Sequence, residues 1–289
     1  MSAADKKPND SSIIVVGTLR NAEKYLEGNF KRLERSLEEF KKVTYYFVES
    51  DSNDRTVAIL DSIQSQTPNF SFLSLGNLSS TIRLRTERIA FCRNEYVNKI
   101  EKDEYDSDYV LVVDLDAIDF ILTKAAVESC WERNDWDVVS ANQESRYFDI
   151  WALRHPVWCP RDWKIEYQEY VTEGMKPSKA LKKSLYSKMI NIDPMSPWIQ
   201  VESAFGGLAI YKTSFFVGNR YIGISSLGVE VCEHVSFHSF TKISKSRFFI
   251  NPKLINEGES SHVQILKLSI RVKTFLKRVM IRSFIIRPL

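Results

Sequence analysis

Tyr109-Val110-Leu111-Val112-Val113-Asp114-Leu115-Asp116 is an uninterrupted apolar run that ends in two carboxylates separated by one leucine. Such a run is typical of a strand buried on both faces of an α/β sheet. Ligands of these sheets bind at the carboxyl ends of the strands. Because residues two apart on an extended chain point the same way, Asp114 and Asp116 can converge on one site. Taken alone, the pattern also fits a strand followed by a solvated acidic turn that includes Asp119.

The carboxylate pair favours a hard divalent cation. Asp114 and Asp116 would repel each other unless a positive charge lay between them. Mg²⁺ and Mn²⁺ take oxygen ligands and also neutralise a diphosphate. The sequence therefore predicts Mn²⁺ or Mg²⁺ as a cofactor at the end of this strand.

Alternating strands and helices surround the central run. Short apolar or aromatic runs predict strands at residues 13–17, 43–48, 70–75, 137–141 and 203–211, besides 109–116. Apolar residues spaced three or four apart predict helices at 21–40, 57–63 and 81–102. This order predicts an α/β fold with a mostly parallel central sheet flanked by helices. We expect a polar tail at 1–10, one domain at 11–255 and an appended segment at 256–289.

Composition places the chain among ordinary globular proteins. Its 289 residues are 44% hydrophobic and 27% charged, enough to bury a full core. The four cysteines, Cys92, Cys130, Cys159 and Cys232, are scattered without zinc-type spacing, which indicates reduced thiols of a cytosolic protein. The polar start and the lack of any run of about 20 apolar residues predict neither a signal peptide nor a membrane span.

The end of the chain is basic. Seven Lys or Arg and no acid follow Glu259, although the net charge of the whole chain is only +3. This asymmetry argues against a general nucleic-acid surface and for a local anionic partner. If residues 256–289 are helical, apolar residues share one face and basic residues flank it, which predicts a peripheral contact with an anionic membrane. Packing on the body or on a dimer partner is the alternative.

Two further segments are rich in binding chemistry. Arg83, Arg85, Arg88 and Arg93 load the start of the predicted helix at 81–102, where phosphate or plain solvent could be their partner. Aromatic rings beside acids in residues 146–154, including Asp149 and Trp151, suit a sugar or form a core edge. Residues 156–200 show little periodicity, and we expect an inserted acceptor-binding or lid region there.

Polar groups also gather late in the chain. Gly206 and Gly207 allow the backbone to approach a ligand closely. The segment 230–238 then groups two carboxylates and two histidines as candidate bases or metal ligands: Glu230, Glu233, His234 and His238.

Taken in order, these motifs resemble the glycosyltransferases of the GT-A (Rossmann-like) fold, and within them the fungal capsule mannosyltransferase-like group. The resemblance covers roughly residues 13–238. It rests on Glu49-Ser50-x-Ser52-x-Asp54-x-Thr56, on Arg88-Ile89-Ala90 with Arg93-Asn94, on Asp114-x-Asp116, and on Phe148-Asp149-Ile150-Trp151-x-x-Arg154.

The resemblance implies a nucleotide-diphosphate sugar donor and a transferred hexosyl group. The residues it implies for the donor are Thr18, Arg20, Asn21, Glu49, Ser52, Asp54, Arg85, Arg88, Arg93, Asp114, Trp151, Gly206 and Gly207. For the metal it implies Asp114 and Asp116, completed by His238 or, less favoured, His234. Glu230 or Glu233 would be the base of an inverting enzyme, and Asp149 would touch the donor sugar in a retaining one.

The predicted function is therefore metal-dependent transfer to a glycolipid or surface polysaccharide precursor, at the cytoplasmic face of a membrane. A haloacid-dehalogenase-like phosphatase also carries two aspartates after a strand. It usually places them on its first strand, with Thr or Val two residues beyond the second acid, whereas here they lie past residue 110 and Ile118 fills that place. A nucleotidyltransferase would share much of the sheet, yet no glycine-rich phosphate loop occurs near residue 17. A non-catalytic, membrane-associated binding protein would need the basic tail but not the carboxylates.

Overall fold

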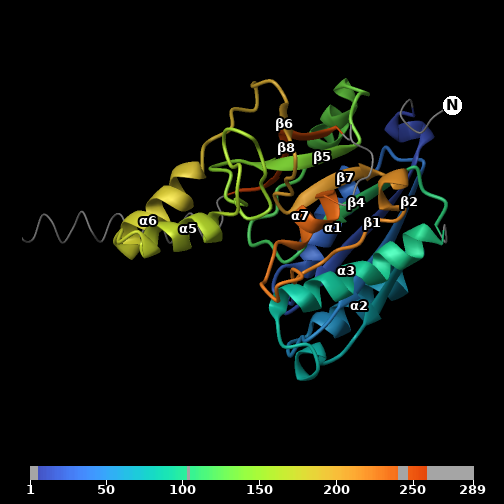
Figure 1. The fold of residues 1–289 in the computed structure, drawn as a ribbon. Coiled ribbons are helices and arrows are strands. Elements are labelled where there is room, and N and C mark those ends of the chain that lie inside the picture. Colours follow the sequence, from blue (N-terminus) through green and yellow to red (C-terminus); the bar gives the residue numbers. More distant parts are fainter. Residues whose placement is uncertain (1–5, 103–104, 240–246, 259–289) are drawn as a thin grey trace, which may run out of the picture.

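One sheet of eight strands runs through the computed structural model, which describes residues 6–102, 105–239 and 247–258 (Figure 1). The strand order is β3-β2-β1-β4-β7-β5-β8-β6. The strands are β1 (Ser12–Leu19), β2 (Lys42–Glu49), β3 (Phe70–Ser74), β4 (Tyr109–Val113), β5 (Val138–Gln143), β6 (Ile199–Val201), β7 (Leu208–Lys212) and β8 (Phe248–Glu257). Four of the seven strand pairs are parallel, so the predicted α/β fold with a mostly parallel sheet is confirmed.

Helices connect most of the strands. They are α1 (Leu26–Ser36), α2 (Thr56–Gln66), α3 (Arg85–Glu101), α4 (Lys124–Glu128), α5 (Trp163–Thr172), α6 (Pro177–Ser184) and α7 (Glu233–Ser239). Short 3-10 turns lie at Pro8–Asp10, Leu78–Ser80, Ser129–Glu132, Tyr186–Lys188 and Thr213–Phe216. The helix predicted from residue 21 begins only at Leu26. Asn21 adopts a left-handed φ of 51° that a helix cannot contain, and a turn in which Tyr25 N donates to the carbonyl of Ala22 at 3.0 Å precedes the helix.

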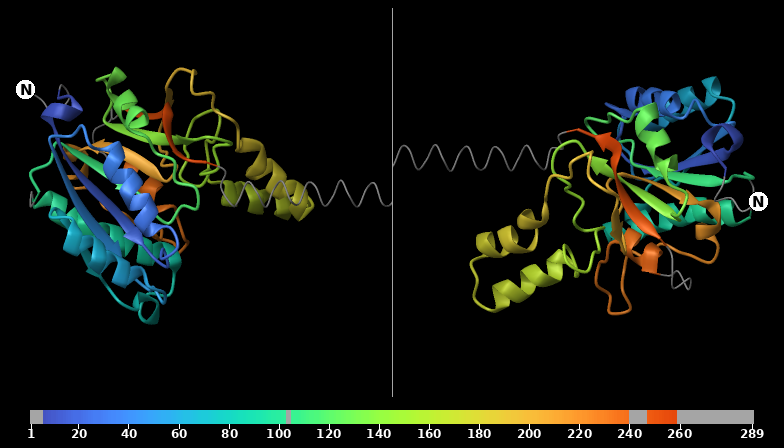
Figure 2. Two further views of the ribbon diagram at one scale, coloured as in Figure 1. Left: turned by 180° about the vertical axis from the view of Figure 1, so that it is seen from behind. Right: turned by 90° about the horizontal axis from the view of Figure 1, so that it is seen from above.

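Alternate residues of the central strands pack on opposite faces of the sheet. Ile13 and Val15 of β1 belong to the core under α1 and α2, whereas Ile14 and Val16 belong to the core under α3 and α7 (Figures 1 and 2). The helices supply Leu26, Phe30, Leu33, Leu60 and Ile63 to the first core, and Tyr96, Val97, Ile100 and Phe237 to the second. Each fully buried side chain of this kind contributes about 1.5–3 kcal/mol, so both faces fix the sheet.

The strand that ends in the two aspartates lies in the middle of the sheet. All five residues of β4 are buried, and the strand pairs parallel with β1 and antiparallel with β7. The carboxyl ends of β1, β2 and β4 therefore share one edge. The polar segments that follow these strands meet there.

The segment that follows β5 and precedes β6 in the chain forms an arm that projects from the body (Figures 1 and 2). It lies within residues 156–200 and contains α5 and α6, where the sequence predicted little regular structure. Asp162 accepts a hydrogen bond from Lys164 N at 2.8 Å as the N-cap of α5, and Pro177 occupies the first turn of α6. Periodicity missed these helices because their buried residues, Glu166, Ala180 and Ser184, are small or polar.

The last strand also escaped the sequence analysis. β8 pairs parallel with β5 and runs to Glu257, two residues past the predicted domain end at 255. Beyond Gly258 the predicted basic amphipathic helix lies outside the described residues. Within the described ranges, every helix is too short or too polar to cross a bilayer.

Candidate active site

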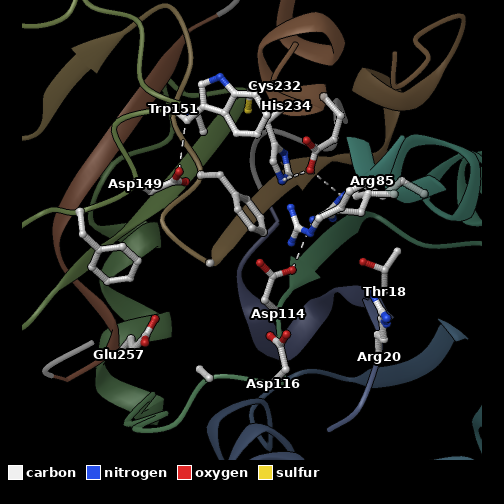
Figure 3. Close-up of a pocket in the computed structure, with 18 of the residues that line it drawn as sticks. Thr18, Arg20, Arg85, Asp114, Asp116, Asp149, Trp151, Cys232, His234 and Glu257 are labelled. Atoms are coloured by element: carbon white, nitrogen blue, oxygen red, sulfur yellow. Dashed lines mark hydrogen bonds and ion pairs between the residues drawn. The ribbon is translucent and has the colours of Figure 1, made fainter. Parts of the chain in front are cut away.

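A pocket of about 750 Å³ opens at the carboxyl ends of β1, β2 and β4, beside the first turns of α3 (Figure 3). Pockets of this size hold small ligands and cofactors. The predicted site residues that line it are Thr18, Arg20, Arg85, Arg88, Arg93, Asp114, Asp116, Asp149, Trp151, Gly207, Glu233 and His234. The predicted residues that the structure does not bring to it are Asn21, Glu49, Ser52, Asp54, Gly206, Glu230 and His238.

Hydrogen bonds on both sides hold the Asp-Leu-Asp segment at the pocket. Asp114 N donates to the carbonyl of Gly207 at 2.9 Å, and Asn29 Nδ2 donates to the carbonyl of Leu115 at 2.9 Å. Leu115 is fully buried in the core under α1, while Asp114 and Asp116 line the pocket (Figure 3). The chain therefore points its two acids to one side and the leucine to the other.

Arg93 is an internal counter-ion of the pocket. Its Nη2 lies 3.3 Å from Asp114 Oδ1, and its Nε lies 3.4 Å from Glu233 Oε1. Its guanidinium also lies over the rings of Phe205 and Tyr221, and only 3% of the residue is exposed. Arg93 thus neutralises two carboxylates of the protein, whereas the resemblance assigned it to a diphosphate.

The other two arginines of α3, Arg85 and Arg88, differ in whether they form an ion pair with an acid of the protein. Arg88 Nε lies 3.3 Å from Asp51 Oδ2, and Arg88 Nη1 donates to the carbonyl of Ile82 at 2.8 Å. Arg85 is exposed at the pocket and forms no ion pair with an acid in the part of the chain that the structure describes. Burial raises the pKa of Asp116, and the positive charge of Arg85 opposes that rise. Arg85 is therefore available to an anion in the pocket.

The pocket holds more negative than positive charge. Burial raises the pKa of Asp114, and the neighbouring carboxylates of Asp116 and Glu233 add to the rise against the attraction of Arg93. Burial likewise raises the pKa of Glu257 to about 7, with Asp114 and Asp116 contributing. A cation bound among these carboxylates would relieve the repulsion.

Glu257 is a pocket residue that the sequence analysis missed. It ends β8, and the pairing of Gln143 in β5 with Glu257 carries it to the pocket rim (Figure 3). Asn251, Pro252, Lys253 and Asn256 interrupt the apolar residues before Glu257, so it lacks the unbroken apolar run that marks Asp114 after β4. Its distance of more than a hundred residues from the aspartates hid the relation.

The two histidines have opposite surroundings. His238 Nδ1 shares a hydrogen bond with Ser203 Oγ at 2.8 Å and its Nε2 with Tyr211 Oη at 3.1 Å, and burial lowers its pKa to about 3. His234 lines the pocket and stacks on Phe205 with ring centroids 3.8 Å apart. Among the described residues, neither ring nitrogen of His234 has a hydrogen-bond partner, although the residue is buried and its Nε2 lies 3.9 Å from Glu233 Oε1. The structure thus brings His234 to the pocket, not the favoured His238.

The two candidate bases, Glu230 and Glu233, lie in different surroundings. Glu230 Oε1 accepts hydrogen bonds from Thr86 Oγ1 at 2.9 Å and Thr86 N at 3.4 Å, so it caps the start of α3 from a distant loop. Glu233 begins α7 and lines the pocket beside Arg93. Of these two glutamates, Glu233 is the one that can meet a substrate.

The residues predicted for base and ribose divide in the same way. Thr18 and Arg20 line the pocket, and Arg20 Nε donates to the carbonyl of Asp51 at 3.2 Å. Glu49 is only 1% exposed, and its carboxylate accepts from Ser52 N at 2.9 Å. Asp51, which the sequence analysis left out, lines the pocket where Glu49 was expected.

Other polar residues of the loop after β2 form hydrogen bonds to the loop after β1. Ser52 Oγ accepts from Asn21 N at 3.0 Å, and Asn21 Oδ1 accepts from Asn53 N at 2.9 Å. Asp54 accepts a hydrogen bond at 3.0 Å from the backbone N of Thr56, the first residue of α2. These contacts join the loops after β1 and β2, which places Thr18 and Arg20 at the pocket.

The glycine pair serves backbone packing. Gly206 and Gly207 have φ of 69° and 83°, and a side chain on Gly206 would meet Gln143 Nε2 at 2.6 Å. Asp149 Oδ2 accepts a hydrogen bond from Gly206 N at 2.9 Å, so this carboxylate fixes the glycine turn and lines the pocket as well. Trp151 Nε1 donates to Asp162 at 2.9 Å, which attaches the arm to the pocket wall.

The donor set of the pocket fits Mn²⁺ or Mg²⁺. Among the described residues, no three His, Cys, Asp or Glu side chains form a ready metal site. Mg²⁺ in proteins commonly takes one or two carboxylates and completes its shell with water and substrate phosphate. Asp114 and Asp116 supply such carboxylates. The imidazole of His234, whose nitrogens make no hydrogen bond to the residues that the structure describes, lines the same pocket.

Comparison with known proteins assigns the chain to no protein family. No protein-family model and no curated protein matches the sequence. Solved structures that resemble the chain include the mannosyltransferase PcManGT from Pyrobaculum calidifontis in complex with GDP-Man and Mn²⁺, with a TM-score of 0.47 and 12% identity over 89% of this chain and 58% of that one. TarS 1–349 of S. aureus resembles this chain with a TM-score of 0.47 and 15% identity, over 86% of this chain and 60% of TarS 1–349. The structure of TarS 1–349 in complex with UDP-GlcNAc has a TM-score of 0.47 and 14% identity over 88% of this chain and 60% of that one.

The chain thus spans about three fifths of the length of these solved proteins.

Proposed function

We propose that this chain is a metal-dependent glycosyltransferase that moves a hexosyl group from a nucleotide-diphosphate sugar to a glycan or glycolipid acceptor. The observation that carries the proposal is the meeting of Asp114, Asp116 and Arg85 in one pocket at the carboxyl ends of the central strands. The carboxylates that line the pocket outnumber its arginines, and Arg85 forms no ion pair with a described acid, so the pocket suits a metal and a diphosphate together. The sequence motifs that resemble GT-A enzymes support the same activity.

Each group has a proposed role toward the donor. Mn²⁺ or Mg²⁺ held by Asp116 and Asp114 would supply the positive charge that stabilises the departing diphosphate. Arg85 binds diphosphate oxygens, and Thr18 and Arg20 contact the nucleoside. His234 is the candidate further metal ligand, because it lines the pocket and its nitrogens make no hydrogen bond within the described part of the chain.

Glu233 is the proposed general base. It takes the proton of the acceptor hydroxyl as that oxygen attacks the anomeric carbon, and the bond from this carbon to the diphosphate oxygen breaks. The nucleoside diphosphate leaves with the bonding electrons. In a retaining reaction no such base is needed, and Asp149 would instead contact the donor sugar.

The acceptor side is proposed from other parts of the chain. Trp151 and the arm residues Trp163, Tyr186 and Met189 form an aromatic and apolar wall of the pocket, which suits the ring faces of a glycan. We place the chain near the fungal capsule mannosyltransferase-like group on its motifs. The seven basic residues after Glu259 suit attachment to an anionic membrane at its cytoplasmic face, where a glycolipid or polysaccharide precursor would be the acceptor.

Donor hydrolysis tests the central proposal. Purified protein is incubated with a panel of UDP- and GDP-sugars, with Mn²⁺ or with a chelator, and the released nucleotide is measured. We expect turnover of at least one donor that requires the metal and falls at least about 100-fold in Asp116→Ala, as the loss of an electrostatic group predicts. Asp61→Ala on the exposed face of α2 is the matched control and should keep full turnover. An Asp116→Ala variant as active as the control would exclude the metal role.

The membrane part has its own test. Deletion of residues 261–289 should weaken binding to anionic vesicles and leave donor hydrolysis largely intact. Unchanged vesicle binding in the deletion variant would refute the tail as an anchor without affecting the proposed chemistry.

A further inference from the structure

The arm carries positive charge that the protein does not neutralise. Between Gly174 and Ile192 there are five lysines and no acid. Two are held by neighbours: Lys183 Nζ lies over the ring of Tyr170, and Lys188 pairs with Glu166 at 2.6 Å. The other three, Lys176, Lys179 and Lys182, are exposed and form no ion pair within the described ranges. Their spacing of three places them along one side of α6.

Large apolar side chains are exposed on the same arm. Ile165 of α5 is 53% exposed, and Val157, Ile190 and Met195 are exposed as well. Scattered exposed apolar residues are ordinary on a protein surface. Here they accompany unpaired lysines on a projecting element, which is the composition of a surface that contacts lipid head groups and acyl chains together.

A second projecting segment carries apolar residues without lysines. The loop between Tyr221 and Cys232 turns at Gly228, and its tip exposes Leu227 by 86% and Val229 by 60%. The hydrogen bonds from Thr86 to Glu230 tie this loop to the start of α3. The tip is therefore held out from the body by a fixed base.

Both segments border the pocket. The arm contributes Trp163, Tyr186 and Met189 to its wall, and the loop leads directly into Cys232 and Glu233. In the right-hand view of Figure 2 the arm and the orange loop both extend from the lower side of the molecule. A flat surface that touched both would lie across the mouth of the pocket.

We propose that the arm, through Lys176, Lys179 and Lys182, and the loop tip, through Leu227 and Val229, dock on an anionic phospholipid bilayer so that the pocket opens toward the lipid. Charge complementarity favours an anionic surface, and the exposed apolar side chains favour a bilayer over a soluble polyanion, which would gain nothing from them. This contact is separate from the basic tail and does not depend on the reaction that the pocket performs.

Vesicle co-sedimentation of the full chain tests the proposal. The vesicles contain about 30% phosphatidylserine in phosphatidylcholine, with pure phosphatidylcholine for comparison. Since each surface lysine contributes about 1 kcal/mol, K176Q/K179Q/K182Q should weaken partition to the anionic vesicles on the order of 100-fold. The matched control is K7Q/K41Q/K42Q, which removes the same charge from exposed lysines at the opposite end of β1 and β2. The tail is unchanged in both variants, so its contribution cancels in the comparison.

A second variant tests the loop without changing charge. L227S/V229S should lower partition at least about tenfold while donor hydrolysis, circular dichroism and melting temperature stay those of the parent chain. Equal losses for the arm and control lysines, or no loss for the loop variant, would overturn the bilayer contact. If K176Q/K179Q/K182Q loses affinity for heparin but keeps its affinity for the vesicles, the arm binds a soluble polyanion and the proposal is wrong.

Discussion

Arg93 Nη2 lies 3.3 Å from Asp114 Oδ1, so the first acid of the Asp-Leu-Asp segment already has a cationic neighbour inside the protein. The same guanidinium reaches Glu233 at 3.4 Å. Arg93 therefore links a carboxylate of the donor end of the pocket to the proposed base. A pocket with several carboxylates can fold before any metal binds because this one buried charge offsets two of them.

Loss of Arg93 should destabilise the fold. Arg93→Met leaves Asp114 and Glu233 without their counter-ion, and breaking a buried pair in this way costs about 3 kcal/mol or more. Urea unfolding measures the change in the free energy of unfolding. Addition of Glu233→Gln to Arg93→Met should recover part of the loss, because one of the two uncompensated charges is then removed.

Arg133→Met is the control for that measurement. Arg133 pairs with Asp135 at 2.7 Å, but the two side chains are 35% and 48% exposed, so its loss should cost at most about 1 kcal/mol. Equal destabilisation by Arg93→Met and Arg133→Met would contradict the role of Arg93 as a buried counter-ion.

The two glutamates before and at the start of α7 should differ in what they affect. Glu230→Ala removes the cap of α3 and should lower stability by about 1 kcal/mol while donor hydrolysis persists, because Glu230 does not line the pocket. Glu233→Gln should keep donor affinity and lower the rate of sugar transfer at least about 100-fold. Steady-state kinetics and urea unfolding of both variants separate the effects. Loss of transfer in Glu230→Ala with normal stability would reverse the assignment.

Local patterns were sufficient to predict the half of the fold that contains the central aspartates. The runs at 13–17, 43–48 and 109–116 are apolar because these strands are covered on both faces, so each appears in the sequence without its neighbours. The convergence of Asp114 and Asp116 also followed from the alternation of an extended chain. These features depend only on residues close together in sequence.

Features set by distant contacts were not predictable in this way. Glu257 reaches the pocket because β8 pairs with β5, and Glu230 is diverted to Thr86 because its loop folds back on α3. His234 and His238 lie one turn apart on α7. His238 is held in the core by hydrogen bonds to Ser203 and Tyr211, which leaves His234 to line the pocket. Residue type alone therefore missed Glu257 and favoured the wrong histidine for the pocket.

The buried histidine should make the protein acid-sensitive. Burial lowers the pKa of His238 to about 3 in the folded chain, against about 6.5 when unfolded. Between these values the unfolded state binds one more proton, so stability falls as the pH drops, by about 1.4 kcal/mol per pH unit between about pH 6 and 4. His238→Gln keeps hydrogen-bonding groups near Ser203 and Tyr211 and removes this titration.

Urea unfolding of both proteins at several pH values isolates the contribution of His238, because the other titrating groups, including His234, are common to both. The difference in stability between the parent and His238→Gln should therefore change with pH at the stated slope. A difference that stays constant from pH 7 to 4 would mean that His238 is not kept neutral by its surroundings.

Metal and nucleotide should stabilise the folded chain only together. Each ligand alone meets part of the pocket, the metal at Asp114 and Asp116 and the diphosphate at Arg85, whereas the pair matches both charges. At 100 times its dissociation constant a ligand adds about 2.7 kcal/mol, which for a chain of this size raises the melting temperature by about 5 °C or more. Thermal unfolding with Mn²⁺ plus UDP or GDP, and with each component alone, measures this. Asp114→Asn/Asp116→Asn should lose the shift and Asp61→Asn should keep it, since Asp61 lies on α2 outside the pocket. A shift that persists in the double variant would mean that the nucleotide binds without the two aspartates, and the carboxylate pair would then need another role.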